Sequence, residues 1–261
     1  MQNKPNLTII KIGGKVLNNP EALQEILSDF ASIQGPKIIV HGGGSDATVL
    51  AQKLGLEAKM VNGRRITDAP MLDIVVMTYA GLLNKNIVAK LSALKTPAIG
   101  LTGADGNCIK SSKRIHPEID FGFVGDVQQV NHLFIHSILE QNVVPVFCAI
   151  THNEDGQLLN TNADTIASEV AIAMAKLYSV KLFYCFEKQG VLEDVDNEDS
   201  VIENINEKLY QDLKQKNAIH SGMIPKLDNC FYALKNHVTE IQIGLPKALN
   251  NTNVKRTSIR L

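Results

Sequence analysis

The chain has 261 residues, of which 44% are hydrophobic and 20% charged, and its formal net charge is -1 at pH 7. This composition is typical of a folded globular protein and argues against a disordered chain. A near-neutral charge without a basic stripe argues against a nucleic-acid-binding protein. The length suits one large domain or two lobes that share a core.

The N-terminus and the cysteines indicate a cytoplasmic protein without a membrane partner. Residues 1–7 are polar and lack the apolar core of a signal peptide. No apolar run approaches the roughly 20 residues that span a bilayer. The four cysteines are scattered without a C-x-x-C pair, as expected for reduced thiols in a cytosol.

Apolar runs, glycine loops and helical segments alternate in the first part of the chain. Residues 7–12 and 37–40 are β-branched apolar runs close to glycines, which predicts two buried strands. Helices are predicted over 20–33 and 45–54, where the first segment has apolar residues at helical spacing. Strand, glycine loop and helix in this order predict a parallel sheet covered by helices.

The alternation continues to the C-terminus, with a flap in the middle. Segment 108–130 has short alternating stretches and is predicted to form a β-hairpin flap. A soft boundary is predicted near Lys176. The remaining predicted helices cover 70–94 (interrupted near Gly81), 163–177, 205–216 and 223–235, and the remaining strands cover 97–101, 143–150, 180–186 and 240–243.

Lys11 lies at the end of the first predicted strand, shortly before Gly13 and Gly14. Lysine rarely lies in a core, and paired glycines let the backbone approach a ligand and present N–H groups to it. The motif indicates a phosphate site, although a solvated strand end with a tight turn is the alternative. It is not a P-loop, because G-x-x-x-x-G-K-[ST] occurs nowhere in the chain.

Three glycines, Gly42 to Gly44, follow the second predicted strand and precede a helix. Their backbone donors and the helix N-terminus form an anion-binding concavity. A flexible turn is the alternative, but three glycines cost conformational entropy, which favours a functional role. An esterase oxyanion loop is excluded by the absence of G-x-S-x-G.

Two further motifs place polar groups at predicted helix starts. Asn162 either caps the helix that begins at Ala163 or holds a ligand, and the helix dipole favours the negative charge of Asp164. Pro225 and Lys226 begin the helix at 223. A lysine there opposes the dipole, and an anionic ligand would resolve the conflict; a surface lysine is the alternative.

His132 and His136 lie four residues apart on a predicted helix. This spacing can bind zinc, but neither H-E-x-x-H nor a third ligand accompanies it. We therefore expect no metal site in the protein itself.

Together the motifs resemble those of the amino-acid kinase family, and within it the acetylglutamate kinases. Each motif is weak alone, and their common order and spacing carry the resemblance. The six motifs are K-I-G-G at 11–14, H-G-G-G at 41–44, N-G-R-R-I-T at 62–67, G-F-V-G at 122–125, N-T-N-A-D at 160–164 and G-M-I-P-K at 222–226.

The resemblance implies a three-layer αβα sandwich around an open, mainly parallel sheet. An N-terminal lobe, residues 1–176, would bind the acylglutamate and form the dimer, and a C-terminal lobe, residues 177–261, would bind the nucleotide. The implied reaction is ATP-dependent phosphorylation of the side-chain carboxylate of N-acetyl-L-glutamate in arginine biosynthesis, with Mg²⁺ carried by the ATP.

The resemblance also implies roles for individual residues. Lys11 and Lys226 would neutralise charge on the transferring phosphoryl group, and Asp164 would orient the two lysines. The carboxylate is already a nucleophile, so catalysis would need positioning and electrostatics without a general base. The implied substrate-binding residues are Gly43, Gly44, Arg64, Arg65, Asn160 and Asn162, and the implied nucleotide-binding residues are Gly13, Gly14, Glu187, Gly190, Gly222 and Met223.

The sequence departs from the family pattern at two places, one in the implied nucleotide site and one in the implied acylglutamate site. The family's Ser/Thr-Asp-x-x-Gly is replaced by the segment 186–190, where Glu187 keeps the acidic charge. Arg64 stands where acetylglutamate kinases usually carry an apolar residue beside the acyl pocket. N-succinyl-L-glutamate has a carboxylate that would pair with this guanidinium; the alternative is that Arg64 turns to solvent and acetylglutamate remains the substrate.

Other functions remain open at this stage. The chain could be another kinase of the family, acting on glutamate, aspartate, carbamate or a nucleotide, or a non-catalytic effector-binding member of the fold. Ten residues precede Lys11, too few for the N-terminal helix that links arginine-inhibited members into hexamers. We therefore expect a homodimer that is insensitive to arginine.

Overall fold

The structure is a computed structural model that describes residues 4–61, 64–194, 196–216, 218–219 and 223–261. The chain divides into two compact units, described separately: unit 1 spans residues 1–37 and 167–261, and unit 2 spans residues 38–166. The units thus differ from the lobes 1–176 and 177–261, because the first 37 residues pack with the C-terminal part. The functional split between those lobes stays a prediction.

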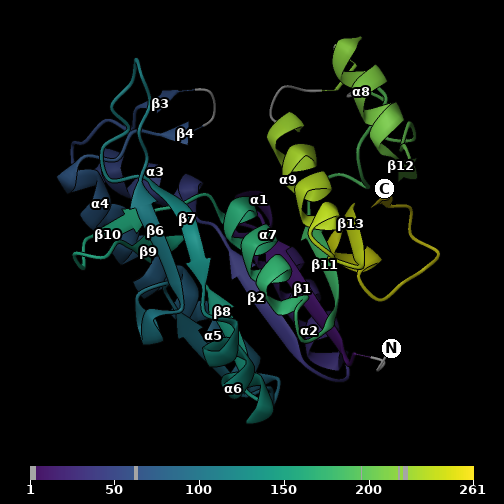
Figure 1. The fold of residues 1–261 in the computed structure, drawn as a ribbon, viewed down its shortest axis with the longest axis horizontal. Coiled ribbons are helices and arrows are strands. Elements are labelled where there is room, and N and C mark those ends of the chain that lie inside the picture. Colours follow the sequence, from purple (N-terminus) through teal and green to yellow (C-terminus); the bar gives the residue numbers. More distant parts are fainter. Residues whose placement is uncertain (1–3, 62–63, 195, 217, 220–222) are drawn as a thin grey trace. The chain divides into compact units, whose positions relative to one another are not determined.

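Unit 1 is built on a mainly parallel arrangement of strands (Figure 1). The strand order is β12 (Asn204–Ile205), β14 (Thr257–Ile259), β13 (Glu240–Gly244), β11 (Ser179–Cys185) and β1 (Asn6–Ile12). β1 pairs with β11 from Asn6↔Ser179 to Ile12↔Cys185, and both are buried because their apolar runs meet helices on each face. Among the described strands of unit 1, the pairs are parallel except that of β13 with β14.

The second helix of unit 1 shows how its sequence sets both ends. Asn19 caps the first turn through its side-chain oxygen, and Pro20 occupies the start. At the other end the ammonium of Lys37 donates to the carbonyls of Phe30, Ala31 and Ile33. The helices of this unit are α1 (Gly14–Leu17), α2 (Pro20–Ser32), most of α7 (Ala163–Met174), α8 (Glu207–Gln215) and α9 (Ile224–Lys235).

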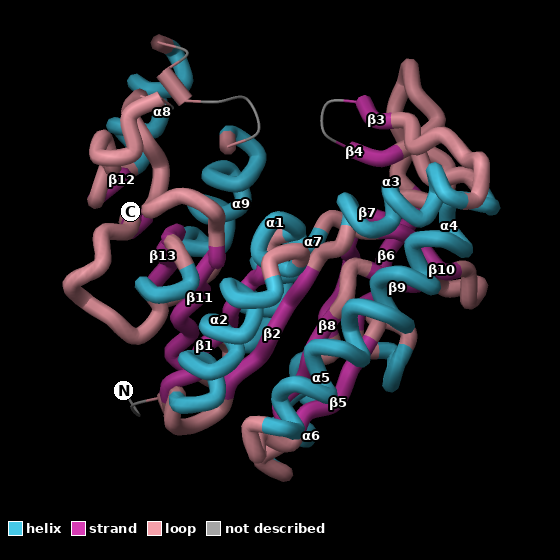
Figure 2. The backbone as a smooth tube through the Cα atoms, turned by 180° about the vertical axis from the view of Figure 1, so that it is seen from behind, coloured by secondary structure: helices cyan, strands magenta, loops and turns pink. Residues whose placement is uncertain are grey.

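Unit 2 holds three parallel strands, two small sheets and the helices beside them (Figure 2). The strands are β2 (Lys37–His41), β8 (Val144–Phe147) and β5 (Ala98–Leu101), in that order. The helices are α3 (Gly44–Lys53), α4 (Ala69–Val76), α5 (Asn84–Ala93) and α6 (His132–Glu140). One small sheet has the strand order β10 (Leu158–Asn160), β9 (Ile150–His152), β6 (Ile109–Lys113) and β7 (Gly125–Val130). The other pairs β3 (Met60–Val61) with β4 (Arg64–Arg65).

The predicted flap is confirmed, since β6 and β7 pair antiparallel. The predicted strand 143–150 is instead divided, because β8 ends at Phe147 and β9 begins at Ile150. The α-helix predicted over 70–94 is interrupted near Gly81, as expected, but by a π-helical segment, Met77–Leu83, that joins α4 to α5.

The helix 69–93 is long and apolar enough to cross a membrane by composition. It nevertheless packs as a core helix of unit 2. Its side chains at Ile74, Val75, Ile87 and Leu91 are buried, and α5 contacts both β5 and β8. The apolarity of this helix is therefore explained by packing.

Candidate active site

The first glycine motif joins β1 to a short helix in unit 1. Gly13 precedes α1 directly, and a Cβ built on it would lie 3.9 Å from Nζ of Lys11. The backbone at Gly13 therefore lies beside the ammonium that the sequence assigns to phosphate. This arrangement suits the approach of an anion to backbone N–H groups and a cation together.

The two predicted catalytic lysines adjoin one tyrosine. Lys11 is the register partner of Tyr184 on the neighbouring strand, so their side chains project to the same face of the sheet. From α9, the Nζ of Lys226 lies over the Tyr184 ring, 4.7 Å from its centre. Lys226 thus lies over this buried ring, and Lys11 projects from the neighbouring strand on the same face of the sheet.

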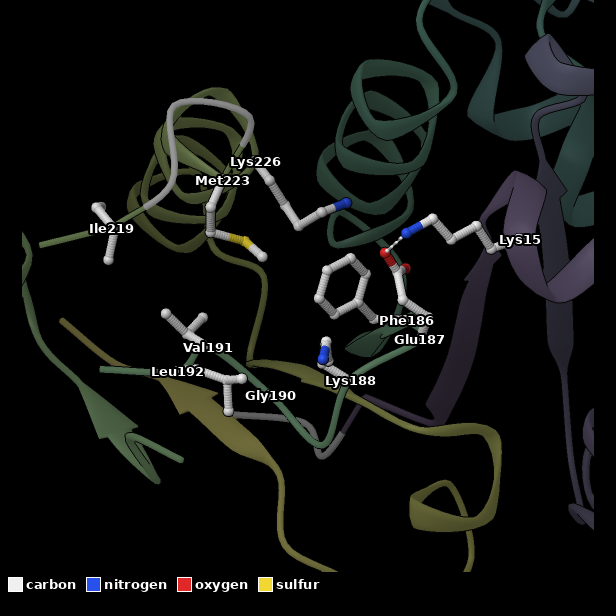
Figure 3. A pocket seen from close by; sticks show the side chains of 10 residues that line it. All are labelled: Lys15, Phe186, Glu187, Lys188, Gly190, Val191, Leu192, Ile219, Met223 and Lys226. Atoms are coloured by element: carbon white, nitrogen blue, oxygen red, sulfur yellow. Dashed lines mark ion pairs between the residues drawn. The ribbon is translucent and has the colours of Figure 1, made fainter. Parts of the chain in front are cut away.

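A cavity of about 370 Å³ in unit 1 contains the end of one of these cations (Figure 3). One part is apolar, and the other carries Lys15, Glu187 and Lys226. Such a cavity suits a flat apolar base at one side and a charged tail at the other. The lining residues are Lys15, Phe186, Glu187, Lys188, Gly190, Val191, Leu192, Ile219, Met223 and Lys226.

The cavity includes three of the six predicted nucleotide residues, Glu187, Gly190 and Met223. Gly13 and Gly14 are outside this lining, and Gly222 lies outside the described residues. A Cβ on Gly190 would lie 2.4 Å from Oγ1 of Thr257, so this glycine is required by packing against β14. Its nucleotide role stays a prediction.

Sequence reasoning missed one ion pair in the cavity. The Nζ of Lys15 lies 2.9 Å from Oε1 of Glu187, and this contact raises the pKa of Lys15 through the hydrogen bond and the charge of its partner. Lys15 directly follows the paired glycines, which was the available signal. The apolar lining at Val191 and Leu192 carried no such signal.

In unit 2 the second glycine motif is joined to Arg65. Nη2 of this buried arginine donates to the Gly44 carbonyl at 2.7 Å and to Oγ1 of Thr48 at 2.8 Å. Nearby, burial raises the pKa of the Tyr79 hydroxyl, and the charge of Arg65 partly offsets the effect. The predicted substrate residues Gly44 and Arg65 are therefore in direct contact.

Gly43 is required by close packing. A Cβ at this position would lie 2.5 Å from Cδ1 of Leu83 and 2.7 Å from Cδ1 of Tyr79. Both side chains come from the π-helical segment. The glycine loop thus fits against that segment only without a side chain.

The two predicted asparagines make structural hydrogen bonds. Nδ2 of Asn160 donates to Oγ1 of Thr67 at 2.9 Å. Oδ1 of Asn162 accepts from the backbone N–H of Asp164 at 2.8 Å and of Thr165 at 3.1 Å. The capping alternative for Asn162 is therefore confirmed, and substrate contacts by either residue stay predictions.

Arg64 is exposed on β4 and lies in the field of a second arginine. Partial burial lowers the pKa of Arg64, the positive charge of Arg114 lowers it further, and Asp126 opposes both. Arg114 itself forms an ion pair with Asp126. Arg114 and Asp126 balance each other, so the charge of Arg64 leaves one positive charge in excess among the three residues.

The predicted histidine pair lies on α6, where Nε2 of His136 is 3.4 Å from Oε1 of Glu140. Across the described ranges, no cluster of three or more His, Cys, Asp and Glu side chains has the arrangement of a metal site.

Comparison with known proteins places these features in a family. The pattern of the amino acid kinase family matches residues 6–244. An acetylglutamate kinase from Phocaeicola vulgatus is 52% identical over 247 residues, covering 95% of this chain and 96% of the relative. Another, from Cytophaga hutchinsonii, is 53% identical over 244 residues, covering 93% of this chain and 92% of the relative.

A solved structure from Streptococcus mutans superposes with a TM-score of 0.77 at 28% identity, covering 91% of this chain and 94% of that one. The family match extends over both units and over the strands, glycine motifs and C-terminal helix that carry the candidate site. The chain therefore belongs to the amino acid kinase family, with the mainly parallel αβα fold that the sequence predicted.

Proposed function

We propose that the protein phosphorylates the side-chain carboxylate of N-acetyl-L-glutamate with MgATP, a step of arginine biosynthesis. The observation that carries this proposal is the similarity to acetylglutamate kinases at about half identity over nearly the whole chain. The placement of Lys226 over the Tyr184 ring and of Lys11 beside Tyr184 on the neighbouring strand supports it, because phosphoryl transfer needs concentrated positive charge.

The reaction balances without proton transfer. A carboxylate oxygen of the substrate forms a bond to the γ-phosphorus of ATP, the bond from that phosphorus to the bridging oxygen breaks, and ADP leaves. Lys11 and Lys226 would neutralise the charge on the transferring group, and Asp164 would orient them. Backbone N–H groups at Gly13, Gly14, Gly43 and Gly44 would contact phosphate oxygens.

The cavity of unit 1 fits the proposed nucleotide. Its apolar part would receive the base, and Lys15 and Lys226 would face the phosphates. The carboxylate among the described lining residues, Glu187, is paired with Lys15, so its repulsion of a polyphosphate is reduced. Mg²⁺ would enter on the ATP as part of the substrate.

A trapping assay tests the function. The protein is incubated with MgATP and each of N-acetylglutamate, N-succinylglutamate, glutamate and aspartate, and hydroxylamine captures the acyl phosphate as a coloured hydroxamate. We expect product only with acylglutamates. Product with free aspartate or glutamate would assign another kinase activity, and nucleotide binding without any product would indicate an effector-binding protein.

We further propose a cytoplasmic homodimer. Apolar side chains of unit 2 are exposed at Met77, Leu82 and Ile99, and Ile99 lies on β5, the last strand in its order. Exposed apolar groups at a strand edge favour association with a second copy. Sedimentation should give twice the monomer mass, and Ile99→Lys should lower it; a monomer or a hexamer would contradict the proposal.

A further inference from the structure

We propose that Tyr184 and Tyr210 are positioning residues that hold Lys226 in its place beside the nucleotide cavity. This inference rests on the proposed function, in which Lys226 stabilises the transferring phosphoryl group. A lysine has a long side chain with several rotatable bonds, and catalysis requires its ammonium at one point. The question is therefore what keeps that ammonium in position.

The local helix does not do so by itself. Lys226 lies in the first turn of α9, where the partial positive charge of the helix end repels a cation. The N-cap residue is Met223, whose side chain has no oxygen that could accept from the first-turn N–H groups. Both the start of this helix and its cation need support from other elements.

Tyr184 supplies the first support. It is fully buried on β11, and Nζ of Lys226 lies 4.7 Å from its ring centre. This distance is within the range of a cation–π attraction, which strengthens where water is excluded. The ring is itself held, because its hydroxyl lies 2.8 Å from Oγ of Ser168 on α7. Because the Tyr184 ring is held in position, it also restricts the position of the Lys226 ammonium.

Tyr210 supplies the second support, from α8. Its hydroxyl donates to Oδ1 of Asp228 at 2.7 Å and lies 3.3 Å from the carbonyl of Ile224. These two residues flank Lys226 on α9. The Tyr210 ring stacks on Phe231, with centres 5.2 Å apart and planes at 20°. Tyr210, which is buried, thus contacts the first turns of α9 on both sides of Lys226 and holds them in place.

The charges around Tyr210 keep its hydroxyl a donor. Burial raises the pKa of Tyr210, and the hydrogen bond to Asp228 and the charge of Asp228 raise it further. Lys214 lies 3.5 Å from Asp228 and also faces the Tyr210 ring. Tyr210 therefore donates its hydrogen bond to the carboxylate of Asp228, whose charge Lys214 partly neutralises.

Figure 3 shows the consequence for the cavity. Lys226 extends from α9 into the space above Phe186, on the same side as Lys15 and Glu187. Phe186 and Glu187 follow Tyr184 by two and three residues. The end of β11 thus contacts Lys226 through Tyr184 and continues into the residues that line the cavity. If Lys226 were not held by Tyr184, its ammonium would not stay aligned with the nucleotide phosphates.

The test compares kcat and KM in tyrosine variants with and without Lys226. We expect Tyr184→Leu to lower kcat about 10-fold and Tyr210→Phe about 3- to 10-fold, with KM for ATP changed less than about threefold. Tyr184→Phe keeps the ring and should recover most of the loss. In the Lys226→Met background, Tyr184→Leu should lower kcat no further, because the residue that it positions is already absent. If Tyr184 only stabilised the fold, the substitution would lower kcat in both backgrounds.

Tyr232 provides the matched control, because it lies on α9 but its side chain is half exposed. Tyr232→Leu should leave kcat unchanged. Circular dichroism and thermal melting establish that each variant folds, and Tyr210→Phe keeps the test decisive if Tyr184→Leu does not fold.

Failure of this inference is distinguishable from failure of the proposed function. Inactive Lys226→Met with normal turnover in both tyrosine variants would overturn the inference alone, as would an equal loss from Tyr184→Leu in both backgrounds. Near-normal turnover in Lys226→Met would overturn the role of Lys226 and the inference together.

Discussion

Nη2 of Arg65 lies 2.7 Å from the carbonyl oxygen of Gly44, so the arginine predicted to hold the substrate is anchored to the glycine loop predicted to hold phosphate. A guanidinium has five N–H donors, and this contact uses only part of them. The remaining donors suit the α-carboxylate of an acylglutamate. In the proposed function, Arg65 would therefore couple the position of the loop to the position of the substrate.

Replacement of Arg65 by lysine tests this coupling. A lysine keeps the charge but cannot bind a carboxylate and a carbonyl with one planar group. We expect Arg65→Lys to raise KM for N-acetylglutamate roughly 10- to 100-fold, about 1.4–3 kcal/mol, while KM for ATP stays within about twofold. An unchanged KM for the acylglutamate would remove Arg65 from the substrate site.

The three proposed catalytic residues, Lys11, Lys226 and Asp164, give a prediction about turnover. Lys11→Ala and Lys226→Ala should each lower kcat by roughly 10²–10³, the range for loss of one electrostatic contact in a transition state. Asp164→Asn should also lower kcat while the far-UV circular dichroism stays that of the wild type. Near-normal rates in all three variants would show that the catalytic assignment is wrong.

Gly43 gives a prediction about stability. Because a Cβ there would lie 2.5 Å from Leu83 and 2.7 Å from Tyr79, Gly43→Ala should destabilise the protein by about 1–3 kcal/mol. Gly81 is the matched control on the π-helical segment, since a Cβ there meets nothing within 4 Å. Gly81→Ala should keep or raise the melting temperature, and equal melting of the two variants would contradict the packing argument.

The cysteines give a prediction about reactivity. Burial raises the pKa of Cys108, Cys148 and Cys185 to about 12 each, and Cys230 is buried as well. Since the thiolate is the reactive form, at pH 8 only about one part in 10⁴ of such a thiol is ionised. Ellman's reagent should react slowly with the native protein. After unfolding it should react with all four thiols. Fast reaction of the native protein would show that a cysteine is accessible.

Elements that their own residues specify were predicted from the sequence, and elements that depend on distant residues were missed. The strand 6–12 and the helix 20–32 were predicted nearly to the residue, because an apolar run and a cap with proline specify them locally. The strands β3, β4, β12 and β14 were missed, since two or three residues leave no periodic signal. The π-helical segment was missed because its spacing of apolar residues resembles that of an α-helix.

The same distinction applies to the site. Glycine motifs and the lysines near them were visible in the sequence, because those residue types are unusual beside buried strands. The pair of Lys15 with Glu187, and the seat of Lys226 on Tyr184, join residues far apart in the chain. Such contacts follow from the pairing of β1 with β11 and the placement of α9, which local patterns do not specify.

The last prediction concerns the acyl group. Arg64 is one residue from Arg65, and its neighbours Arg114 and Asp126 leave a local excess of one positive charge among the three. A ligand that brings a carboxylate to this place would be favoured over one that ends in a methyl group, since a bidentate pair with arginine is strong and geometrically specific. N-succinylglutamate has such a carboxylate. If Arg64 pairs with it, N-succinylglutamate should exceed N-acetylglutamate in kcat/KM by roughly 10-fold or more.

Arg64→Leu should reverse that preference, because it removes the partner of the second carboxylate and restores an apolar surface. Lys113→Leu is a suitable control, since Lys113 is a nearby exposed cation already paired with Asp120, and it should leave the preference unchanged. The opposing possibility is that Arg64, which is exposed, extends along its apolar stem into water. In that case wild type prefers N-acetylglutamate and Arg64→Leu changes nothing, and either result would exclude a role for Arg64 in selecting the acyl group.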